Sequence, residues 1–229
     1  VFMTSDVRNP AVLALLQLTF LLVARFVLPA NPLLPYAFPL ASCSLVTAAL
    51  FGTELGLVTS IPLAILVSFG LPNATELTFF YLVSSLFGVL SLGRARRVIT
   101  FLWAGLAVAI SGTVVVFVNQ LPLPTMTWQN LIVLSSAAFF NGLVSASFSI
   151  LLHSVLAPFL GLVTPVQLID LTRPEHPLLS MMLREAPGTY QHSLQVANLA
   201  EQAAERIGVD PLLIRAGALY HDIGKAVNP

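Results

Sequence analysis

Residues 98–119 read VITFLWAGLAVAISGTVVVFVN and contain no ionisable side chain. A helix needs about 20 predominantly apolar residues, with a range of about 17–25, to cross the hydrocarbon core of a bilayer. This run meets that length, and the basic residues Arg94, Arg96 and Arg97 stand just before it. The stretch therefore predicts a membrane-spanning helix.

Similar apolar runs lie on both sides of this one, separated by Pro, Asn, Gly and charged residues. We predict membrane helices at about 11–28, 36–51, 55–70, 77–92, 98–119 and 130–157. The second, third and fourth runs are near or below the length that a full crossing needs. Small residues in the last two runs, among them Gly105, Gly112, Gly142 and Ser145, suit close helix packing in lipid. Together the runs indicate an all-α, polytopic membrane helix bundle of about six spans.

The composition of the whole chain agrees with a membrane protein. Of its 229 residues, 57% are hydrophobic and 9% are charged, whereas soluble domains carry about 25% charged residues. The net charge is zero, so nothing favours a nucleic-acid polymer as a partner. The one cysteine, Cys43, excludes an internal disulfide and a cysteine-based zinc site.

Charged residues are spread unevenly along the chain. The charged residues of 1–165 are Asp6, Arg8, Arg25, Glu54, Glu76, Arg94, Arg96 and Arg97, and all others follow residue 165. We divide the chain into an N-terminal flank at 1–10, a transmembrane region at 11–157, a junction at 158–187 and a polar segment at 188–229. Prolines break the junction into short pieces, and both ends of the chain look cut.

The basic cluster Arg94, Arg96 and Arg97 sets the expected orientation, because basic loops face the cytoplasm. Two crossings later the chain returns to the cytoplasm. The loops at 29–35, 71–76 and 120–129 then lie outside, and none of them carries Lys or Arg. A count of six crossings also puts residue 1 in the cytoplasm.

Three ionisable residues have ordinary structural explanations. Arg25, near the end of the first run, can extend to the interface. His153 is expected to be a packing or interfacial residue rather than a proton relay. His176, between Glu175 and Pro177, is expected to be structural rather than a ligand.

The polar segment predicts two helices joined by a tight turn. Gly188-Thr189 can open the first helix, and Gly208 can end it. Asp210 is the expected N-cap of the second, followed by Pro211 at its first position. We expect Leu212, Leu213, Ala216, Leu219 and Tyr220 to form the buried face of this second helix, which ends at His221-Asp222.

His192 and the pair His221-Asp222 are the candidate metal ligands. An antiparallel helix pair places the start of one helix beside the end of the other, so His192 can approach the pair. Imidazole nitrogen and carboxylate oxygen suit Fe, Mn or Zn, and a carboxylate can bridge two ions that activate a water. The alternative treats His192 and Asp222 as surface residues. A carboxylate at a helix C-terminus is disfavoured unless a cation compensates it, which argues for the metal.

The runs PEHPLL, LREAPGTYQHSLQVANLAEQAAERIG and DPLLIRAGALYHDIGK resemble the seven-transmembrane HD-domain family, to which the PgpH-type cyclic-di-AMP phosphodiesterases belong. The resemblance is specific over 158–229 and extends more weakly over 11–157. It implies that residues 188–229 are the first helices of an all-α HD phosphohydrolase domain in the cytoplasm. By this resemblance His192, His221 and Asp222 match metal ligands of a two-metal centre of iron or manganese. Asp222 would bridge the ions, and Lys225 would lie near the substrate phosphate, making Asp222 and Lys225 the expected catalytic residues.

The resemblance also implies a function. This function is hydrolysis of the cyclic dinucleotide cyclic-di-AMP to pApA by a membrane-anchored phosphodiesterase of the bacterial inner membrane. The Pro-rich junction, which links the last span to the first metal-ligand helix, is the reason to expect regulation from outside by an extracytoplasmic ligand. The family's remaining ligands would follow Pro229, so we expect the 229-residue chain by itself to be inactive. The family also places a large extracytoplasmic domain before these spans, which puts residue 1 outside and leaves the topology of the first half open.

Other functions stay open at this point. The substrate of an HD phosphohydrolase here could be cyclic-di-GMP, another nucleotide or a phosphomonoester. A non-enzymatic membrane receptor with a degenerate HD domain is a second class. A small transporter fits the composition but leaves the polar segment unexplained. Neither the oligomeric state nor the base of the nucleotide follows from the sequence.

Overall fold

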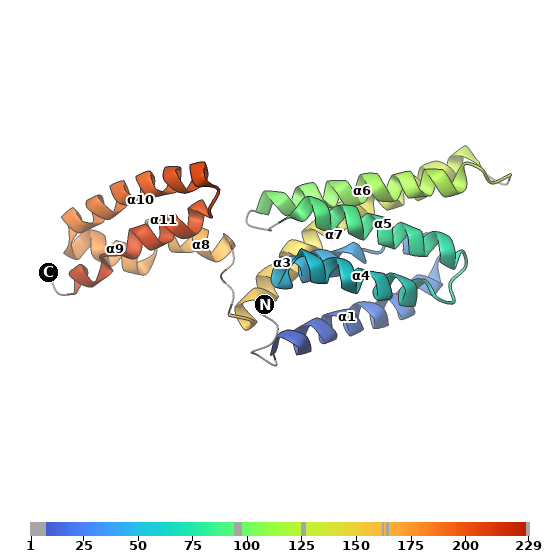
Figure 1. Ribbon diagram of the computed structural model, residues 1–229, viewed down its shortest axis with the longest axis horizontal. Coiled ribbons are helices and arrows are strands. Elements are labelled where there is room, and N and C mark those ends of the chain that lie inside the picture. The colour runs from blue at the N-terminus through green and yellow to red at the C-terminus, as the bar shows by residue number, and fades with distance from the viewer. Residues whose placement is uncertain (1–7, 94–97, 125–126, 162, 164, 228–229) are drawn as a thin grey trace. The chain divides into compact units, whose positions relative to one another are not determined.

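The computed structural model describes residues 8–93, 98–124, 127–161, 163 and 165–227. All regular elements among these residues are helices, which confirms the predicted all-α fold. The chain divides into two compact units, Val1–Leu162 and Val163–Pro229, called here the membrane unit and the polar unit (Figure 1).

The membrane unit consists of long apolar helices. Its elements are α1 (Arg8–Val27), the short 3-10 helix η1 (Leu28–Ala30), α2 (Leu34–Ala37), α3 (Ala41–Phe51), α4 (Thr53–Ser68), α5 (Ala74–Leu92), α6 (Val98–Gln120) and α7 (Trp128–Phe159). Five helical stretches among the described residues are long and apolar enough to cross a membrane, namely Pro10–Ala30, Leu34–Phe51, Ala74–Leu92, Val98–Gln120 and Trp128–Phe159. The remaining predicted run is α4, a shorter apolar helix of 16 residues. The chain is thus a multi-pass membrane protein.

The helices of the membrane unit alternate in direction. Figure 1 shows α1, α4 and α6 running one way, while α3, α5 and α7 run the other way. The beginnings of α1 and α6 and the ends of α5 and α7 therefore lie at one end of the bundle. Arg94, Arg96 and Arg97, on which the expected orientation rests, lie in that connection but outside the described residues.

The second crossing is broken at Pro39, between α2 and α3. Asn141 of α7 repairs the break, because its Nδ2 donates to the carbonyl oxygens of Tyr36 at 3.1 Å and Phe38 at 2.9 Å. Its Oδ1 accepts from the hydroxyl of Ser145 at 2.9 Å. Backbone carbonyls without partners are costly at membrane depth. The amide of Asn141 thus gives the Tyr36 carbonyl a partner, and the Phe38 carbonyl accepts also from the backbone N–H of Leu40 at 2.8 Å.

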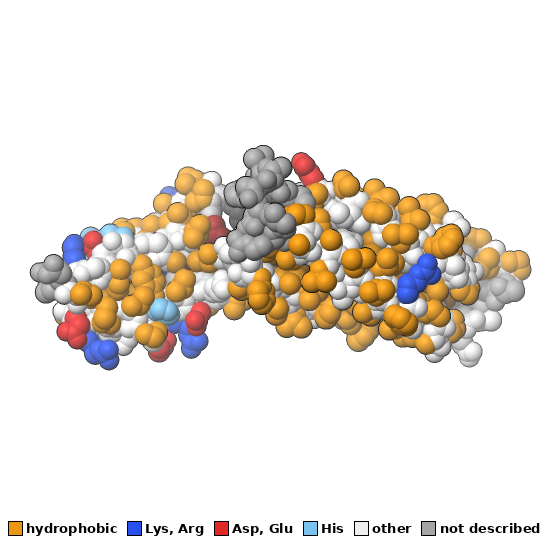
Figure 2. Space-filling view, turned by 90° about the horizontal axis from the view of Figure 1, so that it is seen from below, with side chains coloured by type: hydrophobic (Ala, Val, Ile, Leu, Met, Phe, Trp, Pro, Cys, Tyr) orange, Lys and Arg blue, Asp and Glu red, His pale blue; other side chains and the backbone are white. Residues whose placement is uncertain are grey.

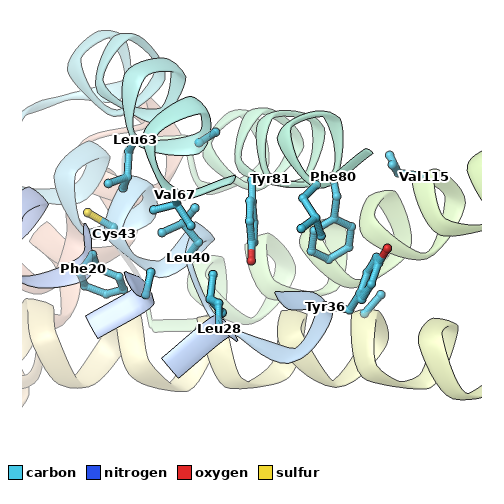
Figure 3. Close-up of a cluster of buried hydrophobic side chains, with 14 of the residues drawn as sticks. Phe20, Leu28, Tyr36, Leu40, Cys43, Leu63, Val67, Phe80, Tyr81 and Val115 are labelled. Atoms are coloured by element: carbon cyan, nitrogen blue, oxygen red, sulfur yellow. The ribbon is translucent and has the colours of Figure 1, made fainter. Parts of the chain in front are cut away.

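Apolar side chains from several helices meet around this break. Figure 3 shows Phe20 and Leu40 together with Val67, Phe80 and Tyr81 in one buried cluster. The Tyr81 hydroxyl donates to the carbonyl of Pro35 at 2.7 Å, on the other side of the break.

Helices α6 and α7 approach each other closely where glycines face each other. A Cβ atom built on Gly142 would overlap the Gly105 carbonyl and the backbone of Ala109. A Cβ on Gly105 would overlap Ala146 in the same way. The small residues therefore set the distance between the helices, as expected for packing in lipid.

Arg25 and His153, two ionisable residues of the membrane unit, lie in different surroundings. Arg25 is exposed at the end of α1, and its Nη1 donates to the carbonyl of Phe69, just after α4, at 2.6 Å. His153 is buried in α7 with its ring 5.6 Å from that of Phe101. No hydrogen-bond partner for its Nδ1 is found among the described residues.

The polar unit contains α8 (Pro165–Leu171), α9 (Pro177–Glu185), α10 (Pro187–Ile207), α11 (Pro211–Tyr220) and the 3-10 helix η2 (Ile223–Ala226). Figure 2 shows hydrophobic side chains across the membrane unit, while most charged side chains on this face lie on the polar unit. Leu179 and Met182 of α9 are buried against Ala197 of α10 and Leu219 of α11. Hence α9, within the segment predicted as a junction, supplies part of this core.

One predicted buried position of α11 is wrong. Ala216 and Leu219 are buried, but Leu213 is 52% exposed. The reason is that α11 packs mainly against α10 and α8, and these neighbours leave Leu213 uncovered. Spacing identified the apolar residues but not which of them meets a partner.

Candidate metal centre

Helices α10 and α11 form an antiparallel pair whose turn follows the predicted signals. Gly208 ends α10 in the left-handed conformation, with φ of 72°, and Asp210 caps α11 by accepting from the backbone N–H groups of Leu212 and Leu213. Across the pair, Nη1 of Arg215 donates to Oδ1 of Asn198 at 2.9 Å and to a carboxylate oxygen of Glu201. These contacts fix how α11 lies along α10.

This arrangement brings the three predicted metal ligands together. His192 lies in the second turn of α10, and His221 and Asp222 directly follow α11. Each offers a ligand atom within 4.8 Å of the others. The rings of His192 and His221 are 5.7 Å apart. All three residues are at least partly accessible, so an ion can reach them from solvent.

The ring of His221 is held in one tautomer. Its Nδ1 lies 2.8 Å from the carbonyl oxygen of Ala218, and because a carbonyl only accepts, Nδ1 carries the proton. Nε2 is then left with a lone pair and lies 3.4 Å from Oδ2 of Asp222. A ring nitrogen fixed by a backbone carbonyl is the usual support of a metal-binding histidine.

Lys225 pairs with the carboxylate of Asp222. Its Nζ lies 2.6 Å from Oδ2, one turn along the chain in η2. The hydrogen bond from Lys225 lowers the pKa of Asp222 against an opposing effect of desolvation, and the charge of Lys225, joined by His221 and His192 when these rings are protonated, lowers it further. Asp222 is therefore an anion at neutral pH, and its side chain caps no helix.

The donor set fits a divalent transition metal ion. Two imidazole nitrogens and one carboxylate oxygen are ligands that Fe, Mn and Zn accept. One of the imidazoles is oriented with its lone pair beside the carboxylate, and the carboxylate is already ionised. The described residues bring three donors together here, which is enough to hold one ion.

A second group of contacts beside this centre was not predicted. The hydroxyl of Tyr220 donates to the carbonyl of Leu171 at 2.8 Å and lies 2.9 Å from Nδ1 of His176. His176 therefore lies against Tyr220 and is absent from the group of metal donors formed by the described residues. The one sequence signal was that Tyr220 immediately precedes His221 on the buried side of its helix. Burial raises the pKa of Tyr220, and the charge of Asp170 raises it further, so the hydroxyl keeps its proton.

Comparison with known families agrees with this arrangement. Residues 3–164 match the family described as 7TM receptor with intracellular HD hydrolase, and residues 189–229 match the HD domain. The chain belongs to this 7TM-HD family. The expected resemblance is thereby confirmed, and the three donors lie within the part that matches the HD domain.

Curated relatives in this family include two named cyclic-di-AMP phosphodiesterases. The chain is 36% identical over 204 residues to PgpH of Bacillus subtilis, covering 85% of the chain and 28% of that relative. It is 31% identical over 197 residues to PgpH of Listeria monocytogenes, covering 85% of the chain and 27% of the relative. An uncharacterised protein of Synechocystis is 32% identical over 201 residues, with 83% and 24% covered. The chain thus spans about a quarter of the length of these relatives, and no solved structure matches it.

Proposed function

We propose that this chain is the membrane region and the first part of the HD domain of a metal-dependent cyclic-di-AMP phosphodiesterase. The observation that carries the proposal is the convergence of His192, His221 and Asp222 within 4.8 Å in a member of the 7TM-HD family. The substrate is inferred from the names of the Bacillus and Listeria relatives.

Each residue of the centre has a proposed role. His192 and His221 bind an ion through ring nitrogens, and the Ala218 carbonyl keeps His221 in the tautomer that permits this. Asp222 would be a ligand of the ion as well, and with two ions of iron or manganese it would be the carboxylate that both share. A bound ion would supply Lewis acidity and a nucleophile derived from water at neutral pH. Lys225 offers a flexible ammonium that can leave Asp222 and neutralise a substrate phosphate.

Metal binding by the 229-residue chain tests the ligand set directly. We expect Mn²⁺ to bind, as measured by electron paramagnetic resonance. His192→Ala or Asp222→Asn should weaken this binding at least tenfold. Asp170→Asn removes an exposed carboxylate elsewhere in the polar unit and is the matched control. Equal binding in Asp222→Asn and Asp170→Asn would contradict the assignment. Since three donors serve one ion, we expect no measurable hydrolysis by residues 1–229 alone.

Activity can be tested by exchange with a relative. This chain would replace the segment that it matches in PgpH of Bacillus subtilis, and membranes with the hybrid would receive cyclic-di-AMP and Mn²⁺. We expect pApA as the product, loss of activity in Asp222→Asn and retention in Asp170→Asn. An inactive hybrid whose HD domain is folded would count against the function. Faster cleavage of cyclic-di-GMP or of a phosphomonoester would retain the phosphohydrolase and reject cyclic-di-AMP as substrate.

We further propose that the HD domain faces the cytoplasm of a bacterial inner membrane and that an extracytoplasmic ligand regulates it. The support is the basic cluster Arg94, Arg96 and Arg97 and the short stretch of sequence between the last residue of α7, Phe159, and the first residue of α8, Pro165. Because Leu179 and Met182 of α9 belong to the core of the polar unit, a junction that includes α9 cannot be replaced by a flexible linker without disturbing this core. A Gly-Ser insertion after Gly161 is the suitable test, and regulation that survives a long insertion would contradict coupling through this segment.

A further inference from the structure

The hydroxyl of Tyr220 joins two segments of the polar unit that are far apart in the sequence. It donates to the carbonyl of Leu171, the last residue of α8, at 2.8 Å. The last carbonyls of a helix have no partner within the helix, so this bond caps α8. On the other side, Nδ1 of His176 lies 2.9 Å from the same hydroxyl, and the two rings meet edge to face with centroids 5.9 Å apart.

The chemistry of the three groups fixes the direction of both bonds. The Leu171 carbonyl can only accept, so the single hydroxyl proton of Tyr220 points to it. The hydroxyl oxygen must then accept from His176, and Nδ1 of His176 must carry a proton. Replacing the hydroxyl by hydrogen breaks both bonds, while the aromatic ring and its apolar contacts remain.

Tyr220 is also the last residue of α11 and is bonded directly to His221. Consecutive Cα atoms are about 3.8 Å apart, so a displacement of Tyr220 is passed to the histidine that offers its Nε2 to the metal. Near its beginning α11 is held to α10 by Arg215 and Glu201. Near its end, Tyr220 holds it to α8 and to the residue that precedes α9.

We infer that Tyr220 and His176 are positioning residues of the metal centre, because they tie the end of α8 and the start of α9 to the residue next to His221. Since α8 is the first helix after the boundary at Leu162, movement of α8 within the polar unit must strain or release His221. This inference rests on the proposed function in taking His221 as a metal ligand, but the contact itself can be tested without metal.

Nuclear magnetic resonance of ¹⁵N-labelled histidines in the metal-free 229-residue chain tests the contact. We expect His176 and His221 each to show one fixed Nδ1–H tautomer. Tyr220→Phe should release His176 into a mixture of tautomers and shift the ring signals of His221. His176→Ala should also shift His221, whereas His176→Asn should restore its signals because the amide nitrogen replaces Nδ1 as donor. Tyr190→Phe, which removes a hydroxyl beside the same apolar cluster, is the matched control.

The same variants are then titrated with Mn²⁺. Residues that orient a ligand typically change metal affinity about 10–100-fold, so we expect at least a tenfold loss in Tyr220→Phe and recovery in His176→Asn. Signals of His221 that are the same in Tyr220→Phe and Tyr190→Phe would overturn the inference, whether or not metal binds. If His176→Asn fails to restore the His221 signals, His176 is not a positioning residue. Absence of Mn²⁺ binding in the unchanged chain would instead reject the proposed function, and the His221 signals would still decide the positioning.

Discussion

The carboxylate of Asp222 can be neutralised either by the ammonium group of Lys225 or by a metal ion. One of its oxygens, Oδ2, faces both the Nζ of Lys225 and the ring of His221. Without metal, the ammonium compensates the carboxylate at the end of α11, where a negative charge is disfavoured by the helix dipole. An ion bound by the histidines would take over that compensation, so Lys225 and a metal compete for the same oxygen.

This pairing predicts the titration of Asp222 in the metal-free protein. Because its pKa is lowered, the pair exists above that pKa and is lost as the pH falls through it. In Lys225→Met the pKa of Asp222 should rise toward the ordinary value of about 3.9, while Lys225→Arg should keep it low. Carbon-13 titration of the carboxyl group measures this, and an unchanged pKa in Lys225→Met would contradict the assigned cause.

The sequence could identify the three donors because two neighbouring residues, His221 and Asp222, follow a helix that pairs with the one carrying His192. It could not identify the contact of His176 with Tyr220. That contact depends on how α8 and α9 fold back onto α11. The four prolines at 165, 174, 177 and 187 indicate where helices break but not the angles between the helices. The tautomer of His221 likewise required the position of the Ala218 carbonyl.

At the scale of elements, helix ends were predictable and helix faces less so. Gly208, Asp210 and Pro211 act on their own backbone, so their effect can be read locally. Leu213 is apolar at a helical spacing, but the helices that pack against α11 leave it exposed. The neighbouring helices determine which side of a helix is buried, so the local sequence pattern does not predict it.

The cap of α11 gives a prediction of stability. Asp210→Ala removes the acceptor of two backbone N–H groups and should destabilise α11 by about 1 kcal/mol, within a range of about 0.5–2. Asp210→Asn keeps an acceptor and should lie close to the unchanged chain. Hydrogen exchange of the α11 amides measures the difference. Equal exchange rates in the two variants would show that the cap does not hold this helix.

The close approach of α6 and α7 gives a second prediction. Gly142→Leu places a side chain where the Gly105 carbonyl and Ala109 leave no space, and overpacking costs about 1–3 kcal/mol. Ser147→Leu, at an exposed position on the same helix, is the matched control. Thermal unfolding in detergent should show a lower midpoint for Gly142→Leu alone. Equal midpoints would mean that the two helices can separate at no cost.

At the scale of the whole molecule, the helices of the membrane unit alternate in direction along the chain (Figure 1). Five stretches have the length of a span, and α4 is the short one. The sequence predicted the approximate limits of these helices because apolar length is a local property. The sequence could not predict how the break between α2 and α3 is compensated, because Asn141 lies about 100 residues later in the chain.

Cysteine labelling tests the proposed orientation. In a chain with Cys43→Ser, a cysteine is introduced by Leu123→Cys in the α6–α7 connection or by Gln202→Cys in α10, both at exposed positions. A maleimide that cannot cross membranes should label the first in intact cells and the second only after permeabilisation. The reverse pattern would place the HD domain outside the cell and reject the orientation drawn from the basic cluster.

Asn141 also imposes an order on biosynthesis. The ribosome delivers Tyr36 to the bilayer before α7 exists, so its carbonyl in the second crossing must wait for an amide made 105 residues later. Nascent chains released before residue 128 should leave Cys43 reactive to a lipid-soluble maleimide, whereas chains extended past residue 159 should protect this buried thiol. Equal protection in both would contradict this order. The last helix of the membrane unit in the sequence is thus the one that completes the beginning of the bundle, and a chain whose synthesis stops early cannot present a finished anchor.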